Sequence, residues 1–392
     1  MSRGFPLRKA ADGDTFAPSA LFPGNVTGPG RYDGRERGER MAALRERGGR
    51  TAWPGQTVAA GLGMLGAVFL LPLLFLPPSD SPPSRASQPA EVLPVPTVTR
   101  PEPTPVPGWD EGGTLRVQTV EGTVEEMTVR EYLWGVVAAE MPASFHQEAL
   151  KAQAVCARTY CVYRRGRGED KHPGADVCSD STCCQARLTR EQAMERWGED
   201  GAQYADKVTQ AVDDTDGLLC LYEGEPIDAL FFSSTEGRTS NAEQVWGESL
   251  PYLVSVDSPE GDEVPGWKTV VTYPASEVER RILAEYPGAD LSGPEESWFG
   301  ASQTDESGTV VRITVGGVSL TGLQARTLFG LRSPRFTVEP GESGFTFHVT
   351  GYGHGVGMSQ YGAHALAVEG KTFRQILEWY YTGITVAGWE GA

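Results

Sequence analysis

The chain is 392 residues long, which exceeds one average domain, and its 34 Lys and Arg residues stand against 52 Asp and Glu residues for a net charge of −18. Residues 1–57 hold ten basic and six acidic residues, so 24 basic and 46 acidic residues remain in 58–392, a net of −22. Such an acidic surface repels a phosphate backbone, so the composition argues against a nucleic-acid partner.

The N-terminal segment 1–57 is rich in Gly and Arg, contains runs such as GRERGER, and has few apolar side chains. It cannot bury enough apolar surface to offset the conformational entropy lost on folding, so we expect a disordered tail. Residues 58–76, VAAGLGMLGAVFLLPLLFL, are nineteen residues without a charge, about the length that crosses a bilayer as a helix. A cleaved signal peptide and a buried core helix are the competing interpretations.

The excess of basic residues before this span places the N-terminus in the cytoplasm, by the positive-inside rule, and the remainder outside. Residues 77–109 are Pro-rich and predict an extended, semi-rigid linker off the membrane. The sequence therefore predicts a single-pass membrane protein in which 110–392 form one extracytoplasmic catalytic domain.

Alternating apolar and polar residues around a short Glu-Gly turn predict a hairpin over 114–127. Thr128 and Glu131 have the spacing of a capping box that opens a helix, and Pro142 disfavours helical geometry at Met141, so the helix should span 129–140. Ser144 and Gln147 predict the start of a second helix that runs to the region of Gly166.

Other segments are predicted from the same patterns: helical pieces over 189–213, a β pair from 218–224 and 226–234, a hairpin over 310–322 around Gly316-Gly317, and late helices near 359–369 and 373–381. Strands mixed with segregated helices indicate an α+β fold, with mixed helices and antiparallel strands around an active-site cleft.

Glu140 lies four residues after Val136 and seven after Leu133, which places it on the apolar stripe of its helix. A carboxyl group there is desolvated, its pKa rises, and it suits a general acid. A helix-terminal Glu paired with a basic residue is the structural alternative. Lys151 and Arg158 lie seven apart on one face of the second helix, where they either orient a carboxyl or anionic sugar or form a solvated basic face.

His172, Cys178, Cys183 and Cys184 fall within thirteen residues, HPGADVCSDSTCC. Thiolates and an imidazole so close together suit a tetrahedral zinc ion, and four protein ligands would make that site structural. The alternative is a disulfide, such as Cys178 with Cys184, which leaves Cys183 free or joined to Cys220. Cys156 and Cys161 lie five apart on the second helix and are interpreted as small core hydrophobes.

The segment GYGHGVGMSQYGA, 351–363, has five glycines that let the backbone approach a ligand closely, and Ser359 can cap the helix that follows. It is no phosphate-binding loop, since it lacks a Gly-Lys-Ser/Thr run. A tight corner packed on the core is the alternative. A cysteine peptidase using Cys156 and His354 is disfavoured, because Cys156 has no nucleophile motif around it.

Several blocks, in order, resemble the stage II sporulation protein D family, whose members include modifiers of autolysins. These are EYLWGVVAAEMPASFHQEALKAQAVCARTY, FFSSTEGRTSNAEQVWGESLPYLVSVDSP, GLQARTLFGLRSPRFTV, GHGVGMSQYGAHALAVEG and ILEWYYTG, and they cover about 113–385. The family's engulfment enzyme is a lytic transglycosylase.

The resemblance implies that Glu140 is the catalytic acid, that Lys151 and Arg158 lie near the active site, and that His172, Cys178 and Cys184 bind zinc. The family pattern often has a His before the last Cys, where this chain has Cys183, so the ligand set changes to one His and three Cys. The expected function is cleavage of peptidoglycan glycan strands at N-acetylmuramic acid to give 1,6-anhydro ends, in sporulation. The alternative is a non-catalytic peptidoglycan-binding enhancer of a peptidoglycan amidase.

Overall fold

The computed structural model describes residues 102–389, except 166, 168–170, 262–263 and 343. The predicted tail 1–57, the predicted membrane span 58–76 and most of the linker 77–109 lie outside the described residues. Among those described, no helix combines the length and the apolar character that crossing a bilayer requires.

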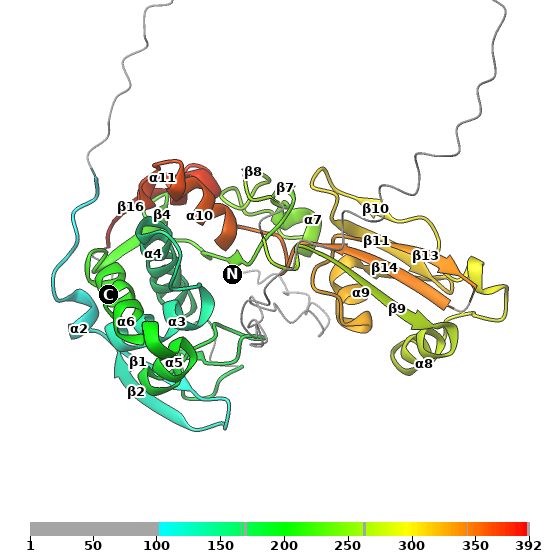
Figure 1. Ribbon diagram of the computed structural model, residues 1–392, viewed down its shortest axis with the longest axis horizontal. Coiled ribbons are helices and arrows are strands. Elements are labelled where there is room, and N and C mark those ends of the chain that lie inside the picture. Colours follow the sequence, from blue (N-terminus) through cyan, green and yellow to red (C-terminus); the bar gives the residue numbers. More distant parts are fainter. Residues whose placement is uncertain (1–101, 166, 168–170, 262–263, 343, 390–392) are drawn as a thin grey trace, which may run out of the picture. The chain divides into compact units, whose positions relative to one another are not determined.

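The described chain has two hydrophobic cores, which we treat as two lobes (Figure 1). The first lobe is formed by 102–261 and 351–389. Its helices are α2 Trp109–Gly112, α3 Val129–Glu140, α4 Gln147–Arg164, α5 Arg190–Trp197, η2 Gly198–Asp200, α6 Gly201–Asp213, α7 Ala242–Trp246, α10 Gln360–Val368 and α11 Phe373–Tyr380. Its strands are β1 Thr114–Gln118, β2 Val124–Thr128, β3 Val177–Cys178, β4 Leu218–Tyr222, β5 Glu225–Pro226, β6 Phe231–Phe232, β7 Gly237–Arg238, β8 Asp257–Ser258, β15 Met358–Ser359 and β16 Thr385–Gly388.

Local signals place the first elements as expected. β1 and β2 form the predicted antiparallel hairpin. Thr128 caps α3 by accepting a hydrogen bond from the N–H of Glu131, and Met141 is extended before Pro142, so α3 ends at Glu140. The start of α4 differs from the prediction, because Ser144 lies inside a turn closed by Phe145 N–H and Pro142 O; the cap is His146.

The predicted β pair of 218–224 and 226–234 is correct only in part. β4 pairs with the short β5 and, on its other side, with β16 from the end of the chain. The chain then turns where the N–H of Leu230 bonds to the carbonyl of Asp228. Because of this turn β6 leaves β4 and pairs in parallel with β15, which brings the Gly-rich segment 351–363 into the first lobe.

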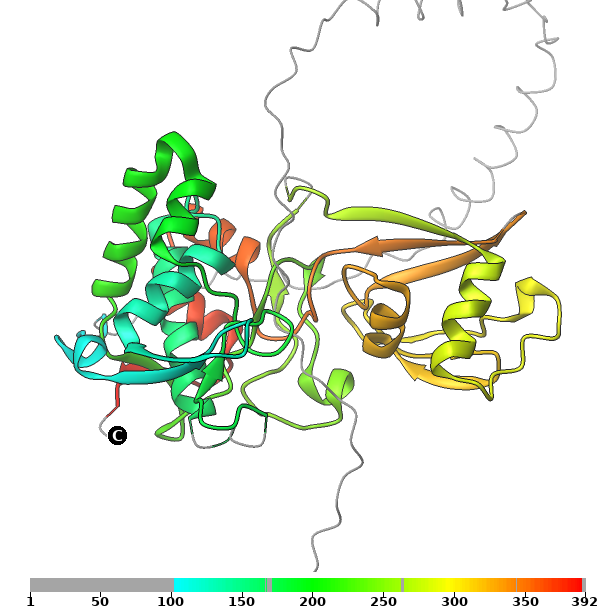
Figure 2. The same cartoon turned by 90° about the horizontal axis from the view of Figure 1, so that it is seen from below.

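Helix α4 lies at the centre of the first lobe and is buried along most of its length. Helices α3, α6, α10 and α11 pack on it together with β4 (Figures 1 and 2). Since α10, α11 and β16 come from the C-terminal end, the first lobe is completed by residues far apart in sequence.

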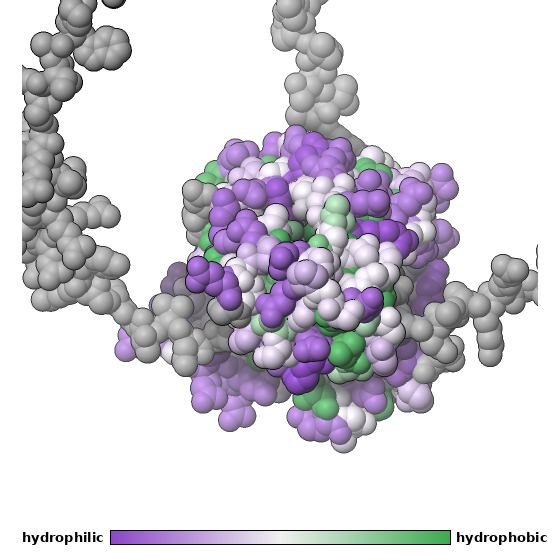
Figure 3. Space-filling model, turned by 90° about the vertical axis from the view of Figure 1, so that its right-hand side faces the viewer, coloured by the Kyte–Doolittle hydropathy of each residue, from purple (hydrophilic) through white to green (hydrophobic). Residues whose placement is uncertain are grey.

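The second lobe, 268–350, is inserted into the first. Its elements are β9 Lys268–Pro274, α8 Ala275–Glu285, η3 Glu295–Ser297, β10 Gln303–Thr304, β11 Val310–Val315, β12 Val318–Thr321, α9 Gly322–Phe329, β13 Phe336–Gly341 and β14 Gly344–Thr350. Two antiparallel sheets, β10-β11-β12 and β13-β14-β9, enclose a core rich in phenylalanine rings. Figure 3 shows a largely hydrophilic face with apolar residues in small groups. Helices and mainly antiparallel strands in both lobes confirm the α+β class.

Candidate active site and candidate metal centre

Glu140 is the last residue of α3, and only 5% of it is exposed. Its Oε1 accepts a 2.7 Å hydrogen bond from the main-chain N–H of Ala186. Burial raises the pKa of Glu140 to about 8, against the lowering effect of the hydrogen bonds from Ala186 and the Gln360 side chain. The structure therefore places Glu140 on the buried side of α3, as its spacing predicted, with a carboxyl group that holds its proton at neutral pH.

Close packing around Gly135 explains how Ala186 reaches Glu140. A Cβ atom at Gly135 would lie 2.6 Å from the carbonyl oxygen of Leu188, so only glycine permits this approach. The N–H of Leu188 bonds to the carbonyl of Gly135 at 3.1 Å. The chain segment after the cysteine cluster is thereby held along α3, and its Ala186 N–H lies at the carboxyl group.

Gln360 comes from the Gly-rich segment and is the first residue of α10, directly after the capping residue Ser359. Its Nε2 donates to Oε1 of Gln153 on α4 at 3.3 Å, and both side chains are buried. Gln153, Gln360 and Glu140 thus form a buried polar chain across three helices. The glycine pattern of 351–363 indicated a functional segment but did not indicate a role for Gln360, because no local sequence signal shows which residue its side chain contacts.

Tyr352, from the same segment, lies within electrostatic range of Glu140. Burial is the main cause of its raised pKa; Arg332 and Arg326 lower this pKa, and Glu140 raises it. The guanidinium carbon of Arg332 lies 4.3 Å from the centre of the Tyr352 ring. Tyr352 therefore interacts with the candidate acid Glu140 and with the guanidinium groups of Arg332 and Arg326, neither of which was predicted as a site residue from the sequence.

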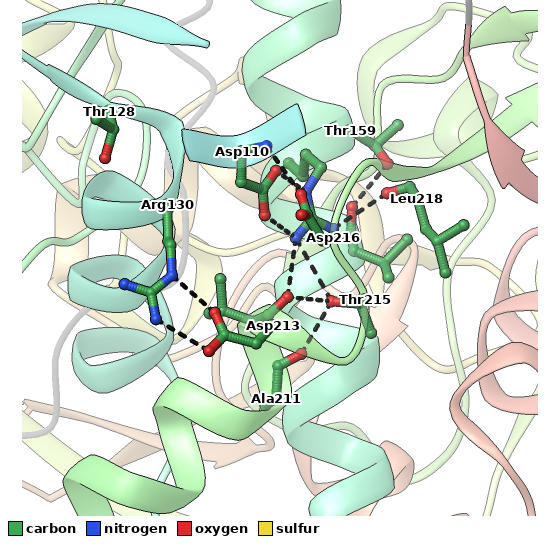
Figure 4. Close-up of polar contacts among 12 residues, drawn as sticks. Asp110, Thr128, Arg130, Thr159, Ala211, Asp213, Thr215, Asp216 and Leu218 are labelled. Atoms are coloured by element: carbon green, nitrogen blue, oxygen red, sulfur yellow. Dashed lines mark hydrogen bonds and ion pairs between the residues drawn. The ribbon is translucent and has the colours of Figure 1, made fainter. Parts of the chain in front are cut away.

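Arg158, expected near the active site, is fully buried in a different environment. Its partners there include Asp110 and Leu218, which Figure 4 labels. Its Nε and Nη2 donate to the two carboxylate oxygens of Asp110 at 2.7 and 2.6 Å, and Nη1 donates to the carbonyl of Leu218. These hydrogen bonds join α2 to α4 and β4, so Arg158 stabilises the fold of the first lobe.

Lys151 forms ion pairs with Glu148 at 3.1 Å and Asp214 at 2.9 Å. Within the described part of the chain, no hydrogen bond or ion pair joins Lys151 or Arg158 to Glu140. The common helix face that their spacing predicted does not bring them into direct contact with the acid.

The side chains of His172, Cys178, Cys183 and Cys184 come together, with their ligand atoms within 4.8 Å of one another. The Sγ atoms of Cys183 and Cys184 each lie 3.4 Å from Nε2 of His172. Neighbouring ligands around a tetrahedral zinc ion lie about 3.5 Å apart, given zinc bonds of about 2.0–2.3 Å. All six cysteines of the chain are free, so no disulfide joins Cys178 to Cys184.

The surroundings of the cluster also fit a metal. Nδ1 of His172 lies 3.2 Å from Oε1 of Gln118, which leaves Nε2 turned toward the thiols. A ligating histidine commonly has such a partner on its other nitrogen. The strand β3 fixes Cys178 beside β1, and the carbonyl of Asp180 accepts the N–H groups of both following cysteines. The donor set therefore fits zinc.

The cysteine–histidine pairing does not form. Sγ of Cys156 lies 3.3 Å from the Tyr381 hydroxyl, while Nε2 of His354 lies 3.0 Å from the carbonyl of Phe231. Burial lowers the pKa of His354 to about 3, so it is a neutral core residue. Ser359 does cap α10, as predicted, by accepting the N–H of Gly362.

Comparison with known proteins places this geometry in a family. A family model described as "Stage II sporulation protein" matches residues 118–222, which span α3, α4 and the cysteine cluster. The chain is 36% identical over 271 residues to "Stage II sporulation protein D" of Bacillus amyloliquefaciens, covering 69% of this chain and 77% of that protein. The chain belongs to the stage II sporulation protein D family.

A second family member, "Stage II sporulation protein D" of Bacillus subtilis (strain 168), is 35% identical over 271 residues, with 69% of this chain and 77% of that protein covered. The chain is also similar to the "Amidase enhancer" of Bacillus subtilis (strain 168), at 28% identity over 314 residues, 66% of this chain and 40% of that protein. The proteins similar to this chain thus include members named for sporulation and a relative named for enhancing an amidase.

Proposed function

We propose that this family member is a peptidoglycan lytic transglycosylase in which Glu140 is the general acid and then the general base. The observation that carries the proposal is the buried carboxyl group of Glu140, whose pKa burial raises to about 8. A protonated carboxyl group at neutral pH is what a glycosidic oxygen needs as it leaves.

In the first step Glu140 donates its proton to the glycosidic oxygen that leaves C1 of N-acetylmuramic acid, and the ring gains oxocarbenium character. In the second step the resulting carboxylate takes the proton of the sugar's own 6-hydroxyl group, whose oxygen bonds to C1. This closes a 1,6-anhydro ring, consumes no water and returns Glu140 to its protonated state. The hydrogen bonds from Ala186 N–H and Gln360 support the carboxylate between the two steps.

We propose that His172, Cys178, Cys183 and Cys184 hold one structural zinc ion. Four protein ligands leave no open position, so zinc would supply folding stability and no reactive water. The cluster ends two residues before Ala186, so the same loop that would bind the metal positions the N–H group at Glu140.

The proposal also includes the location of the protein: residues 58–76 anchor it in the cell membrane, with the N-terminus in the cytoplasm and the catalytic domain outside. The support is the uncharged length of this segment and the basic residues before it. Peptidoglycan is then in reach of the domain beyond the Pro-rich linker, and an active-site cleft that we propose around Glu140 would receive its glycan strands.

The test is the mass of the products formed from purified glycan strands, with stem peptides present or removed. Wild-type protein should release ends that are lighter by one water than hydrolysed ends, and Glu140→Gln should retain its fold and lose roughly 10²–10⁴-fold in rate. Reducing ends would identify a hydrolase with a second carboxylate. Absence of cleavage, with stimulation of an added amidase, would instead support the function named for the relative "Amidase enhancer".

A further inference from the structure

Arg332 and Arg326 both lie around Tyr352 and have no acidic partner in the described part of the chain. Among the residues that the structure describes, no Asp or Glu forms an ion pair with either of them, whereas Arg158, Arg238 and Arg335 all have acidic partners. The Nε of Arg326 donates only to the carbonyl of its near neighbour Leu331, at 3.3 Å. A guanidinium group that no carboxylate of the chain occupies is available to bind an anion from outside.

The position of Arg332 is fixed by its backbone and by its neighbours. Its carbonyl accepts the N–H of Gly353 at 3.0 Å, which ties it to the segment that carries Tyr352 and Gln360. Its guanidinium lies over the Tyr352 ring. Gly266 makes room for it, because a Cβ atom there would lie 2.5 Å from Nη1 and the φ angle of +66° favours glycine.

Tyr352 relates Arg332 to Glu140. The guanidinium carbon of Arg332 lies 4.3 Å from the centre of the Tyr352 ring, and the pKa of Tyr352 is lowered by this guanidinium and raised by the carboxyl group of Glu140. Arg332 also lowers the pKa of Tyr361, the residue after Gln360. Arg332 itself is half-buried, so it is held in place and still open to a ligand.

A guanidinium group that lies over an aromatic ring can still offer the N–H donors at its edge to a ligand. Two of these donors form a planar fork, and a carboxylate accepts a hydrogen bond from each of them. N-acetylmuramic acid (muramic acid for short) differs from N-acetylglucosamine by a lactyl ether that ends in a carboxyl group, which is either free or extended by a peptide with further carboxylates. The muramic acid unit next to Glu140 thus presents an anion where the chain leaves two arginines without acidic partners.

We propose that Arg332, assisted electrostatically by Arg326, forms a subsite for the carboxylate that muramic acid carries, and so selects muramic acid over N-acetylglucosamine beside Glu140. This inference rests on the proposed glycan-cleaving function, because it takes the sugar at Glu140 as the ligand. It adds a residue that determines specificity and touches the substrate away from the bond that breaks.

The test measures binding in full-length Glu140→Gln protein in detergent, so that no turnover is needed. The ligands are a tetrasaccharide of alternating N-acetylglucosamine and muramic acid with free lactyl carboxylates, the same tetrasaccharide with stem peptides, and chitotetraose, which has no carboxylate. Adding Arg332→Gln should weaken binding of the muramic acid ligands about ten- to hundredfold, as expected for a lost charged hydrogen bond, and leave chitotetraose binding unchanged.

Two further variants control the result. Arg332→Lys keeps the charge and should lose less affinity than Arg332→Gln. Arg280→Gln removes an equal charge from an exposed arginine paired with Glu277 and should change nothing. A larger effect of Arg332→Gln on the stripped ligand would identify the lactyl carboxylate, and a larger effect on the peptide-bearing ligand would identify a stem carboxylate.

Equal losses on all three ligands, or no loss on any, would overturn the subsite. Binding is measured in the Glu140→Gln background and does not depend on cleavage. If the wild-type protein fails to cleave strands, the enzymatic proposal is refuted, while selective binding of carboxylates by Arg332 can still be observed. Thermal unfolding of each variant identifies a loss of fold, and Arg332→Lys still decides the question if Arg332→Gln is unstable.

Discussion

The main-chain N–H of Ala186 donates a hydrogen bond of 2.7 Å to Oε1 of Glu140. Ala186 follows Cys184 by two residues, so the cysteine cluster and the candidate acid depend on one short segment of chain. Among substitutions of Ala186 only proline removes this backbone donor, so with any other side chain the contact persists as long as the loop keeps its place. Disturbing the cluster should therefore affect the carboxyl group of Glu140 as well as stability.

Cleavage should depend on pH through the protonated form of Glu140. With its pKa at about 8, the acid keeps its proton through neutral pH and the rate should fall above pH 8. Gln360→Met removes a hydrogen bond that lowers this pKa, so the alkaline fall should move to higher pH, with a lower rate throughout. Gln210→Met, at an exposed position of α6, is the matched control. If the pH dependence of the cleavage rate were the same in Gln360→Met as in the wild type, Gln360 would have no effect on the pKa of Glu140.

The same pKa predicts how stability varies with pH. The pKa of Glu140 is raised from 4.5 to about 8 in the folded state, so the folded protein holds this proton more tightly than the unfolded chain does. The resulting stabilisation is complete below pH 4.5 and is lost as pH rises through 8. The Gln side chain of Glu140→Gln does not titrate. From pH 4.5 to 8 the free energy of unfolding of this variant should therefore rise relative to that of the wild type, by up to a few kcal/mol. If the difference between the two free energies of unfolding stayed constant from pH 4.5 to 8, the raised pKa would be contradicted.

Arg158 should be a stability residue. Arg158→Leu leaves the carboxylate of Asp110 buried without its partner, which should cost about 3–5 kcal/mol in denaturant unfolding. The double variant with Asp110→Leu should recover much of that loss. Arg130→Leu, which breaks the exposed pair with Asp213, should change stability by less than about 1 kcal/mol. If Arg158→Leu abolished cleavage at unchanged stability, a catalytic role would replace the structural one.

Metal content should depend on each cysteine of the cluster. Cys178→Ser, Cys183→Ser and Cys184→Ser should each lower the zinc content from about one per chain and reduce the unfolding temperature, since metal binding and folding are coupled. Cys161→Ala, a buried free cysteine outside the cluster, should keep its zinc. Full zinc in Cys183→Ser would leave a site of three protein ligands, and metal-free folded wild-type protein would end the proposal.

The orientation in the membrane can be measured on intact protoplasts. If 58–76 anchor the protein with its basic flank inside, as we propose, added protease should remove the chain beyond about residue 77 and spare the N-terminal tail. Antibodies against a tag at each end would report both fragments. A protected C-terminal domain in intact cells that becomes sensitive on lysis would place it in the cytoplasm.

Local chemistry made much of the first lobe predictable. Thr128 and Pro142 mark the two ends of α3 with side-chain and backbone geometry that involve only neighbours. The position of Glu140 on the apolar stripe follows from helix periodicity, and the cysteine cluster follows from spacing within thirteen residues. Each of these depends on contacts close in sequence, which is why the pattern alone suffices.

The partners of Glu140 could not be predicted in the same way. Gln360 lies 220 positions further along the chain, and it arrives through the parallel pairing of β6 with β15, which has no local signal. The spacing of Lys151 and Arg158 predicted a shared helix face but gave no means of finding Asp110, one of two acidic residues in a four-residue helix. Arg332 carries no motif, and its significance appears only from the absence of an acidic partner within the described residues.

The insertion of the second lobe sets an order on biosynthesis. The two ends of this lobe are neighbours, since Lys268 pairs with Thr350 across β9 and β14, so it can fold on a ribosome-bound chain from its own residues. The first lobe cannot, because β4 pairs with β16 and Glu140 interacts with Gln360, and both partners are synthesised after the second lobe. A nascent chain therefore lacks the complete site until Thr385–Gly388 have been made, and a protein truncated before β16 should be inert however well its second lobe has folded.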